Sequence, residues 1–238
     1  MTDLVLLTCI AFLASTITAM IGIGGGSLLI ASMPGFLPGA AIIPIHAVVQ
    51  LFSNLSRALF AYRHIRWDYL TSFIVGSVSG IMISVPFIKE FNFDHVPILI
   101  ACYILYITWG PKLEIVERPK GEFVIFGFVQ TILSLFVGAI GPLGQSLLLR
   151  KGLNLHALIV STALFMVITH AIKIVVFGVL GFSFNEYWIL ITCMVISSIF
   201  GSIAGTYARS RAPNWNYQLF LKVLFTGLAI RMILVTVN

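Results

Sequence analysis

The sequence predicts an all-α fold, that of a polytopic helical membrane protein built from two inverted repeats. Hydrophobic residues make up 59% of the 238 residues and charged residues only 9%, whereas a soluble domain carries about 25% charged residues. Long apolar runs recur along the chain, and the same landmarks appear in the same order in both halves. So few charges cannot wet the surface of a globule, which excludes a soluble enzyme, a disordered chain and a nucleic-acid-binding protein.

Apolar runs follow one another from one end of the chain to the other. A full transmembrane helix needs about 20 residues at about 1.5 Å rise each. Most of the runs are long enough, but the second is too short to cross, as is the stretch 145–149. The runs are Leu4–Ile21, Ser27–Phe36, Ile43–Tyr62, Tyr69–Ile88, Val96–Trp109, Phe123–Val137, Leu155–Gly181, Tyr187–Ala208 and Tyr217–Val237.

Each of the two short stretches follows a glycine cluster. The first cluster is Gly22-Ile23-Gly24-Gly25-Gly26, and the second runs from Gly138 to Gly144 with Pro142 inside it. Glycine and proline break a helix, and in a bilayer the freed backbone is tolerated only where protein buries it or where it lines a watery cavity. Neither cluster fits the GxGxxG or GK[ST] pattern of a nucleotide-binding loop. We therefore expect broken transmembrane segments at both places.

The two halves share three landmarks in the same order, which indicates an internal repeat. After each glycine cluster comes a His-Ala pair, at His46 and at His156, and then a Gly-x-x-x-Gly pair, Gly76/Gly80 and Gly201/Gly205. Such small residues most often let helices approach closely within one chain, with a homodimer seam as the alternative. The predicted divisions are a first transmembrane repeat at 1–110, a charged cytoplasmic linker at 111–122 and a second transmembrane repeat at 123–238.

Basic residues, which mark the cytoplasmic side, decide the expected topology. If every run crossed, four basic residues would face outside: Arg150, Lys151, Arg209 and Arg211. The conflict disappears if Leu4–Phe36 and Phe123–Leu149 are re-entrant hairpins with the glycines at their tips. Each inverted repeat then consists of one hairpin and three spans, a common transporter architecture with both termini outside. The alternative is eight full spans in two four-helix repeats.

Two predicted spans carry a polar face, which is costly in a membrane and usually functional. The polar residues recur at helical spacing on Ile43–Tyr62 and again on Leu155–Gly181. An alternative for Arg57 is that it snorkels to the membrane surface, and His46 and His156 are interpreted as structural because they lie near helix starts. The faces consist of His46, Gln50, Ser53, Asn54 and Arg57, and of Thr162, Met166, Thr169, His170 and Lys173.

The charges inside the predicted membrane region are all positive. The eight carboxylates of the chain lie in loops or at helix ends, so none is expected to bind a metal cation or to balance Arg57 and Lys173. Buried cations need a partner, and the amides of a broken helix also suit an anion. The three cysteines are far apart, without metal-ligand spacing, so we expect no metal and no cofactor. The sequence thus predicts an anion-binding site.

These motifs resemble those of the TauE/SafE family, also called the 4-toluene sulfonate uptake permeases. The first half carries the resemblance in Gly22–Gly26, Pro44–Gln50 and Tyr62–Asp68, and the second half in Gly138–Gly144, Ser161–Ala163 and Thr169–Lys173. The likeness spans nearly the whole chain. It implies a bacterial inner-membrane transporter of sulfur-containing anions, and it places both glycine segments with Thr162, His170 and Lys173 at the site.

We predict a secondary transporter that moves a small sulfur-containing anion, such as sulfite, sulfoacetate or another sulfonate, out across the bacterial cytoplasmic membrane by alternating access. Export is favoured because one negative charge moving outward gains about 2.3 kcal/mol per 100 mV. The alternative is a non-transporting membrane subunit that assembles with partner proteins. Expected partners are the anion and the lipid bilayer, with a homodimer as an option and no nucleic acid. The predicted binding residues are Gly24, Gly25, Gly26, Gln50, Asn54, Arg57, Gly141, Gly144, Thr162, His170 and Lys173.

Overall fold

Helices are the regular elements throughout the part of the chain that the computed structural model describes, which is residues 1–22, 24–60, 62–111, 121–140, 147–148, 150–153, 155–209 and 218–237. Three short 3-10 helices, η1 (Tyr62–His64), η2 (Phe93–His95) and η3 (Phe184–Tyr187), join longer elements. The all-α prediction is confirmed. The α-helices are α1 (Thr2–Ile21), α2 (Gly25–Ser32), α3 (Gly39–Phe60), α4 (Trp67–Lys89), α5 (Val96–Trp109), α6 (Glu122–Val137), α8 (Leu155–Val179), α9 (Trp188–Arg209) and α10 (Gln218–Val237).

Six helices within those ranges, α1, α3, α4, α8, α9 and α10, are long and apolar enough to cross a membrane. The number agrees with the prediction, but one member of the set differs. The run Val96–Trp109, predicted as a span, forms α5 with only 14 residues, which rise about 21 Å against a hydrocarbon core of about 30 Å. Gly110 ends this helix in extended backbone just before Pro111. In its place α1, with 20 residues, qualifies by length and hydropathy.

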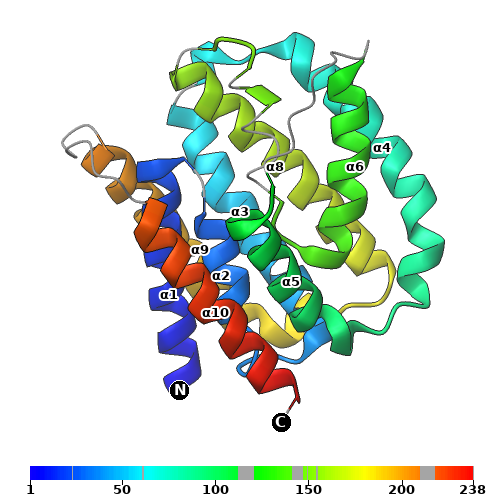
Figure 1. Cartoon of the computed structure of the whole chain (residues 1–238), viewed down its shortest axis with the longest axis vertical. Coiled ribbons are helices and arrows are strands. Elements are labelled where there is room, and N and C mark those ends of the chain that lie inside the picture. Colours follow the sequence, from blue (N-terminus) through cyan, green and yellow to red (C-terminus); the bar gives the residue numbers. More distant parts are fainter. Residues whose placement is uncertain are drawn as a thin grey trace.

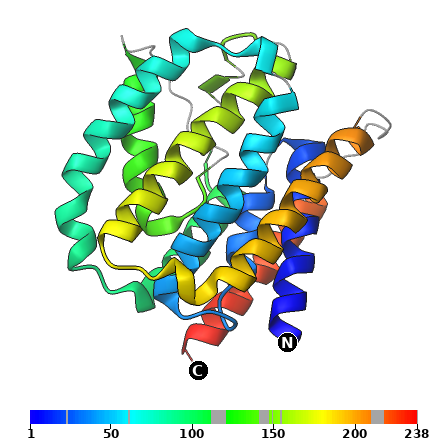
Figure 2. The same ribbon diagram turned by 180° about the vertical axis from the view of Figure 1, so that it is seen from behind.

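Each half of the chain opens with a hairpin. α1 ends at Gly22, whose φ of 94° is left-handed, and α2 packs back against α1. Both chain ends lie at the same end of the molecule, where α3 also begins, so that α1 and α2 lead out and back (Figures 1 and 2). In the second half Lys151 forms an ion pair with Glu122, so the chain at Lys151 lies beside the start of α6. The chain therefore folds back where the charge pattern predicted hairpins, although residues 141–146 lie outside the described ranges.

The helices of the two halves pack reciprocally. α1 of the first half lies along α9 of the second, and α6 of the second lies along α4 of the first. α3 and α8 pack against each other between these pairs. The corresponding helices α1 and α6, α3 and α8, and α4 and α9 run in opposite directions (Figure 1), which is the arrangement expected of an inverted repeat.

Glycines make the two reciprocal contacts possible. A Cβ atom on Gly76 of α4 would lie 1.8 Å from the carbonyl oxygen of Val124 in α6, and one on Gly201 of α9 would lie 2.3 Å from that of Phe12 in α1. Real Cβ atoms never come so close to backbone, so only glycine allows these helices to touch. The Gly-x-x-x-Gly pairs therefore serve helix packing within one chain, as predicted from the sequence.

The outer faces of the described helices are apolar. Large side chains such as Met82 on α4, Val179 on α8 and Phe220 on α10 are more than half exposed, at 73%, 80% and 61%. Such a surface matches lipid tails rather than water. The chain is therefore a multi-pass membrane protein, with its polar side chains turned inward.

The glycine contacts generate a stability prediction. Gly201→Ala forces α1 and α9 apart and should lower the melting temperature in detergent by roughly 2–10 °C, from an overpacking cost of about 1–3 kcal/mol. The matched control is Gly227→Ala on α10, where an added Cβ meets nothing within 4 Å. That change should leave the melting temperature unaltered or raise it slightly, since alanine favours the helix. Equal melting temperatures for the two variants would contradict the packing role of Gly201.

Candidate functional site

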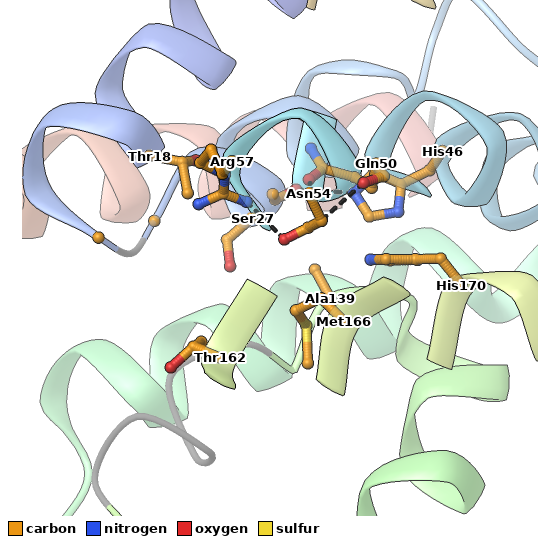
Figure 3. Close-up of a pocket in the computed structure, with 13 residues that line it drawn as sticks. Thr18, Ser27, His46, Gln50, Asn54, Arg57, Ala139, Thr162, Met166 and His170 are labelled. Carbon is orange, nitrogen blue, oxygen red and sulfur yellow. Dashed lines mark hydrogen bonds between the residues drawn. The ribbon is translucent and has the colours of Figure 1, made fainter. Parts of the chain in front are cut away.

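The two polar faces predicted from the sequence meet at the centre of the molecule. α3 and α8 pack against each other, and Gln50, Asn54 and Arg57 of α3 face Thr162, Met166 and His170 of α8 (Figure 3). The members of both faces are buried, from Lys173 at 0% exposed to Thr162 and Met166 at 8%. Arg57 is only 7% exposed, so it does not snorkel to the membrane surface.

A cavity of about 40 Å³ lies between these faces and the first glycine cluster. Seven of the eleven predicted binding residues line it, while two others, Gly141 and Gly144, lie outside the described residues. Gly25 and Lys173 are described but do not line the cavity. The lining residues are Thr18, Gly22, Gly24, Gly26, Ser27, His46, Gln50, Asn54, Arg57, Ala139, Thr162, Met166 and His170.

Arg57 is held in the cavity by neighbours on its own helix. Its Nη2 donates to Asn54 Oδ1 and its Nε donates to the Ser53 carbonyl at 3.4 Å. Asn54 in turn donates from Nδ2 to the Gln50 carbonyl at 2.6 Å and to Gln50 Oε1 at 3.3 Å. A guanidinium has five N–H donors, so these two bonds leave further donors for a ligand.

No carboxylate in the described ranges pairs with either buried cation. The ion pairs found there, Arg66 with Asp68 and Lys151 with Glu122, involve residues at helix starts or in loops. Arg57 has only the amide and carbonyl oxygens named above. In a medium of low dielectric such charge is costly without a negative partner. The described part of the cavity therefore carries an unbalanced positive charge.

Lys173 lies one turn beyond His170 and supports the second glycine break. Its Nζ donates to the Gly138 carbonyl at 2.6 Å, at the residue that ends α6 with a φ of 84°. This bond satisfies a carbonyl that the helix can no longer pair. Lys173 does not line the cavity, although the sequence pattern suggested that it would bind the ligand directly.

His46 bonds to the backbone beside the first glycine break, in the first turn of α2. Its Nε2 lies 3.0 Å from the Gly26 carbonyl oxygen, and because a carbonyl can only accept, Nε2 carries the proton. The structural role expected of His46 is therefore present. His46 also lines the cavity, where its ring meets that of His170 edge to face with centroids 5.5 Å apart. The side chain of His156, its counterpart in the repeat, lies outside the described residues.

Adjacent glycines of the first cluster have different surroundings. A Cβ on Gly25 would lie 1.8 Å from the Ala14 carbonyl oxygen, whereas one on Gly26 would meet the Gln50 side chain at an ordinary 3.7 Å. Gly24 has a φ of 96° and faces Phe225 of α10. Gly25 thus serves the contact between α2 and α1, and Gly26 forms part of the cavity wall.

Several buried polar atoms at the site have no partner. They belong to side chains at most 8% exposed, and buried polar groups are nearly always hydrogen-bonded. Gln50 Nε2 and Thr162 Oγ1, both on lining residues, offer hydrogen-bond donors to a ligand. The unpartnered atoms on the two facing helices are His46 Nδ1, Gln50 Nε2, Ser161 Oγ, Thr162 Oγ1 and His170 Nδ1.

The sequence interpretation missed several lining residues. Thr18 in α1 and Ser27 in α2 lie beside the first glycine cluster, and Gly22 and Ala139 belong to the two clusters but not to the set of predicted binding residues. Their only sequence signal is proximity to the glycines. Within the described ranges no group of three His, Cys, Asp or Glu side chains could hold a metal ion.

Comparison with known proteins identifies one family. A family model described as "Sulfite exporter TauE/SafE" matches residues 7–232. The match includes both hairpins, both polar faces and α10 up to Met232. No curated protein and no solved structure matches the chain.

The contrast between Gly25 and Gly26 gives a second prediction. Gly25→Ala places a methyl group on the Ala14 carbonyl and should lower the melting temperature by at least several degrees, as overpacking costs about 1–3 kcal/mol. Gly26→Ala adds the same group in ordinary contact with Gln50 and should leave the melting temperature within a degree or two of wild type. Thermal unfolding of both variants in one detergent tests the assignment, and a stable Gly25→Ala protein would contradict it.

Proposed function

This chain belongs to the TauE/SafE sulfite exporter family, and we propose that it exports sulfite or a similarly compact sulfur oxyanion across the bacterial cytoplasmic membrane. Family membership over residues 7–232 makes the chain a membrane transporter of the sulfite or sulfonate exporter type, with a small anion as substrate. The identity of the anion, the outward direction and the residues involved are the added proposals.

The unbalanced charge of Arg57 carries the proposal. This buried guanidinium lines the cavity without a carboxylate partner in the described part of the chain. Arginine is well suited to oxyanions because its donors match a pair of oxygens. Gln50 Nε2 and Thr162 Oγ1 add neutral donors that have no partner of their own. An oxyanion in the cavity would satisfy all three groups at once.

The volume of the cavity supports a compact substrate. A water molecule needs roughly 10–15 Å³ of such space, so 40 Å³ holds about three water-sized groups. Sulfite, a sulfur atom with three oxygens, is close to this size, whereas an aryl sulfonate is much larger. We therefore propose sulfite or a one-carbon sulfonate as the substrate rather than 4-toluenesulfonate.

Export requires no further energy source in this proposal. Each negative charge that leaves an inside-negative cell gains about 2.3 kcal/mol per 100 mV. The two hairpins supply the elements for alternating access, since each is packed against the other half of the chain: α1 on α9, and α6 on α4. Movement of one hairpin-bearing unit relative to the other would open the cavity to either side in turn.

Flux measurements with Arg57→Gln test the charge assignment. In proteoliposomes with a set membrane potential, wild type should move sulfite down the electrical gradient. The variant should be at least about tenfold slower, because a hydrogen bond to a charged group contributes about 1.5–3 kcal/mol. Arg63→Gln, which changes an exposed arginine just past the end of the same helix, should match wild type. Undiminished flux in Arg57→Gln would refute the assignment, and a folded wild type that moves no anion would favour the non-transporting subunit.

A carboxylate placed beside Arg57 should mimic the missing partner. Asn54→Asp keeps the oxygen that accepts from Arg57 Nη2, adds the negative charge and loses the two bonds that Nδ2 donates to Gln50. Sulfite binding should weaken by more than about tenfold. Asn92→Asp is the matched control, because Asn92 accepts from the Asp94 amide in an exposed turn and an aspartate there keeps that bond. Calorimetric titration with sulfite compares the two, and unchanged affinity in Asn54→Asp would contradict the role of Arg57.

A further inference from the structure

The two histidines at the cavity form a pair that sulfite binding alone does not explain. His46 from α3 and His170 from α8 meet edge to face with ring centroids 5.5 Å apart, and both line the cavity. His46 is 0% exposed and His170 is 3% exposed. Each has a buried Nδ1 atom without a hydrogen-bond partner.

The bond to Gly26 defines what His46 can do. Because Nε2 donates its proton to the Gly26 carbonyl, the neutral ring keeps a lone pair on Nδ1. That lone pair can accept a proton from solvent without loss of the bond to Gly26. Protonation of either ring forms one N–H bond and breaks none in the protein, and no electron transfer is involved.

The charged groups that act on the two rings are all cations. The charge of Lys173 opposes a positive charge on either histidine, and the charge of Arg57 opposes one on His170. The neighbouring helix α2 has no titratable residue. On α9 the guanidinium of Arg209 donates to the Ala19 carbonyl of α1, and its positive charge opposes that of Arg57. The described carboxylates stand at helix starts, ends or turns: Asp3 on α1, Asp68 on α4, Glu90 after α4, Asp94 on η2, Glu122 on α6 and Glu186 on η3.

We propose that the His46–His170 pair binds one proton when the anion binds, so that anion and proton cross the membrane together. In the empty cavity Lys173 and Arg57 oppose a further positive charge. An oxyanion supplies the missing negative charge, and with a dianion bound an added proton brings the site closer to neutrality. Two adjacent imidazoles resist double protonation, which limits the uptake to one proton. This inference rests on the proposed anion site.

The coupling alters the charge that each cycle moves. A sulfite dianion accompanied by one proton carries a single negative charge, so the membrane potential still drives export. Because linkage is reciprocal, a proton that binds with the anion must also strengthen anion binding. Sulfite affinity should therefore rise as pH falls, by about tenfold per pH unit for one linked proton.

Calorimetric titration in buffers of different protonation enthalpy measures the proton count. At mildly alkaline pH, where free sulfite is a dianion, wild-type protein should take up close to one proton for each sulfite bound. The double variant His46→Gln/His170→Gln should take up none. His95→Gln is the matched control, because His95 lies exposed in η2, and it should behave as wild type.

The possible outcomes separate the two proposals. Sulfite binding without proton uptake in wild type overturns the coupling and leaves the anion site intact. Uptake that persists in the double variant also overturns it, because the proton then binds to sulfite itself or to Lys173. Failure of sulfite to bind wild type overturns both proposals.

A second measurement on the wild type guards against a double variant that does not fold. The chain has five histidines, and nitrogen-15 NMR of histidine-labelled protein distinguishes an imidazolium from a neutral ring. One new imidazolium signal should appear when sulfite is added. Its absence would overturn the coupling without any reference to a variant.

Discussion

The fold depends on the need to satisfy backbone groups that the glycine breaks release inside a membrane. A bilayer offers no water to these groups, so the protein must provide partners. At the second break the partner comes from the long helix that follows the hairpin, where Lys173 of α8 donates to the Gly138 carbonyl. At the first break His46 of α3 donates to the Gly26 carbonyl, in the first turn of α2. Two basic side chains thus hold two broken segments on either side of one cavity.

The same solution determines the electrostatics of the site. Basic groups that satisfy carbonyl oxygens do not need carboxylates, and the described carboxylates stand at helix ends and turns. The centre of the molecule therefore collects arginine, lysine and histidine with only neutral oxygens opposite them. Because Arg57 and Lys173 bond only neutral oxygens, the site is left with a shortage of negative charge, and a mobile anion can make up that shortage.

Much of the fold and part of the site follow from the sequence alone. The 3.6-residue period predicts both polar faces, because a helical face is encoded in residue spacing. The positions of the basic residues predict the hairpins, because four of them would face outside if every run crossed the membrane. The period does not encode where a long side chain ends: the Lys173 ammonium donates to the Gly138 carbonyl, and its direct contact with the ligand stays a prediction. Thr18 and Ser27 were not predicted because they lie in α1 and α2, outside the two polar faces that the period identified. The run Val96–Trp109 is apolar enough for a span, but the α5 that it forms has only 14 residues and ends at Gly110.

The reciprocal packing has a consequence for how the chain is made. α1 is synthesised before its main partner α9, whose Ser197 hydroxyl donates to the Thr8 carbonyl at 2.8 Å across 189 residues of sequence. Until α9 is synthesised, the backbone of α1 that Gly201 will cover stays exposed to lipid. The N-terminal hairpin must therefore wait in the membrane for most of translation. The first half of this protein is completed by its second half, and neither repeat is a self-contained folding unit.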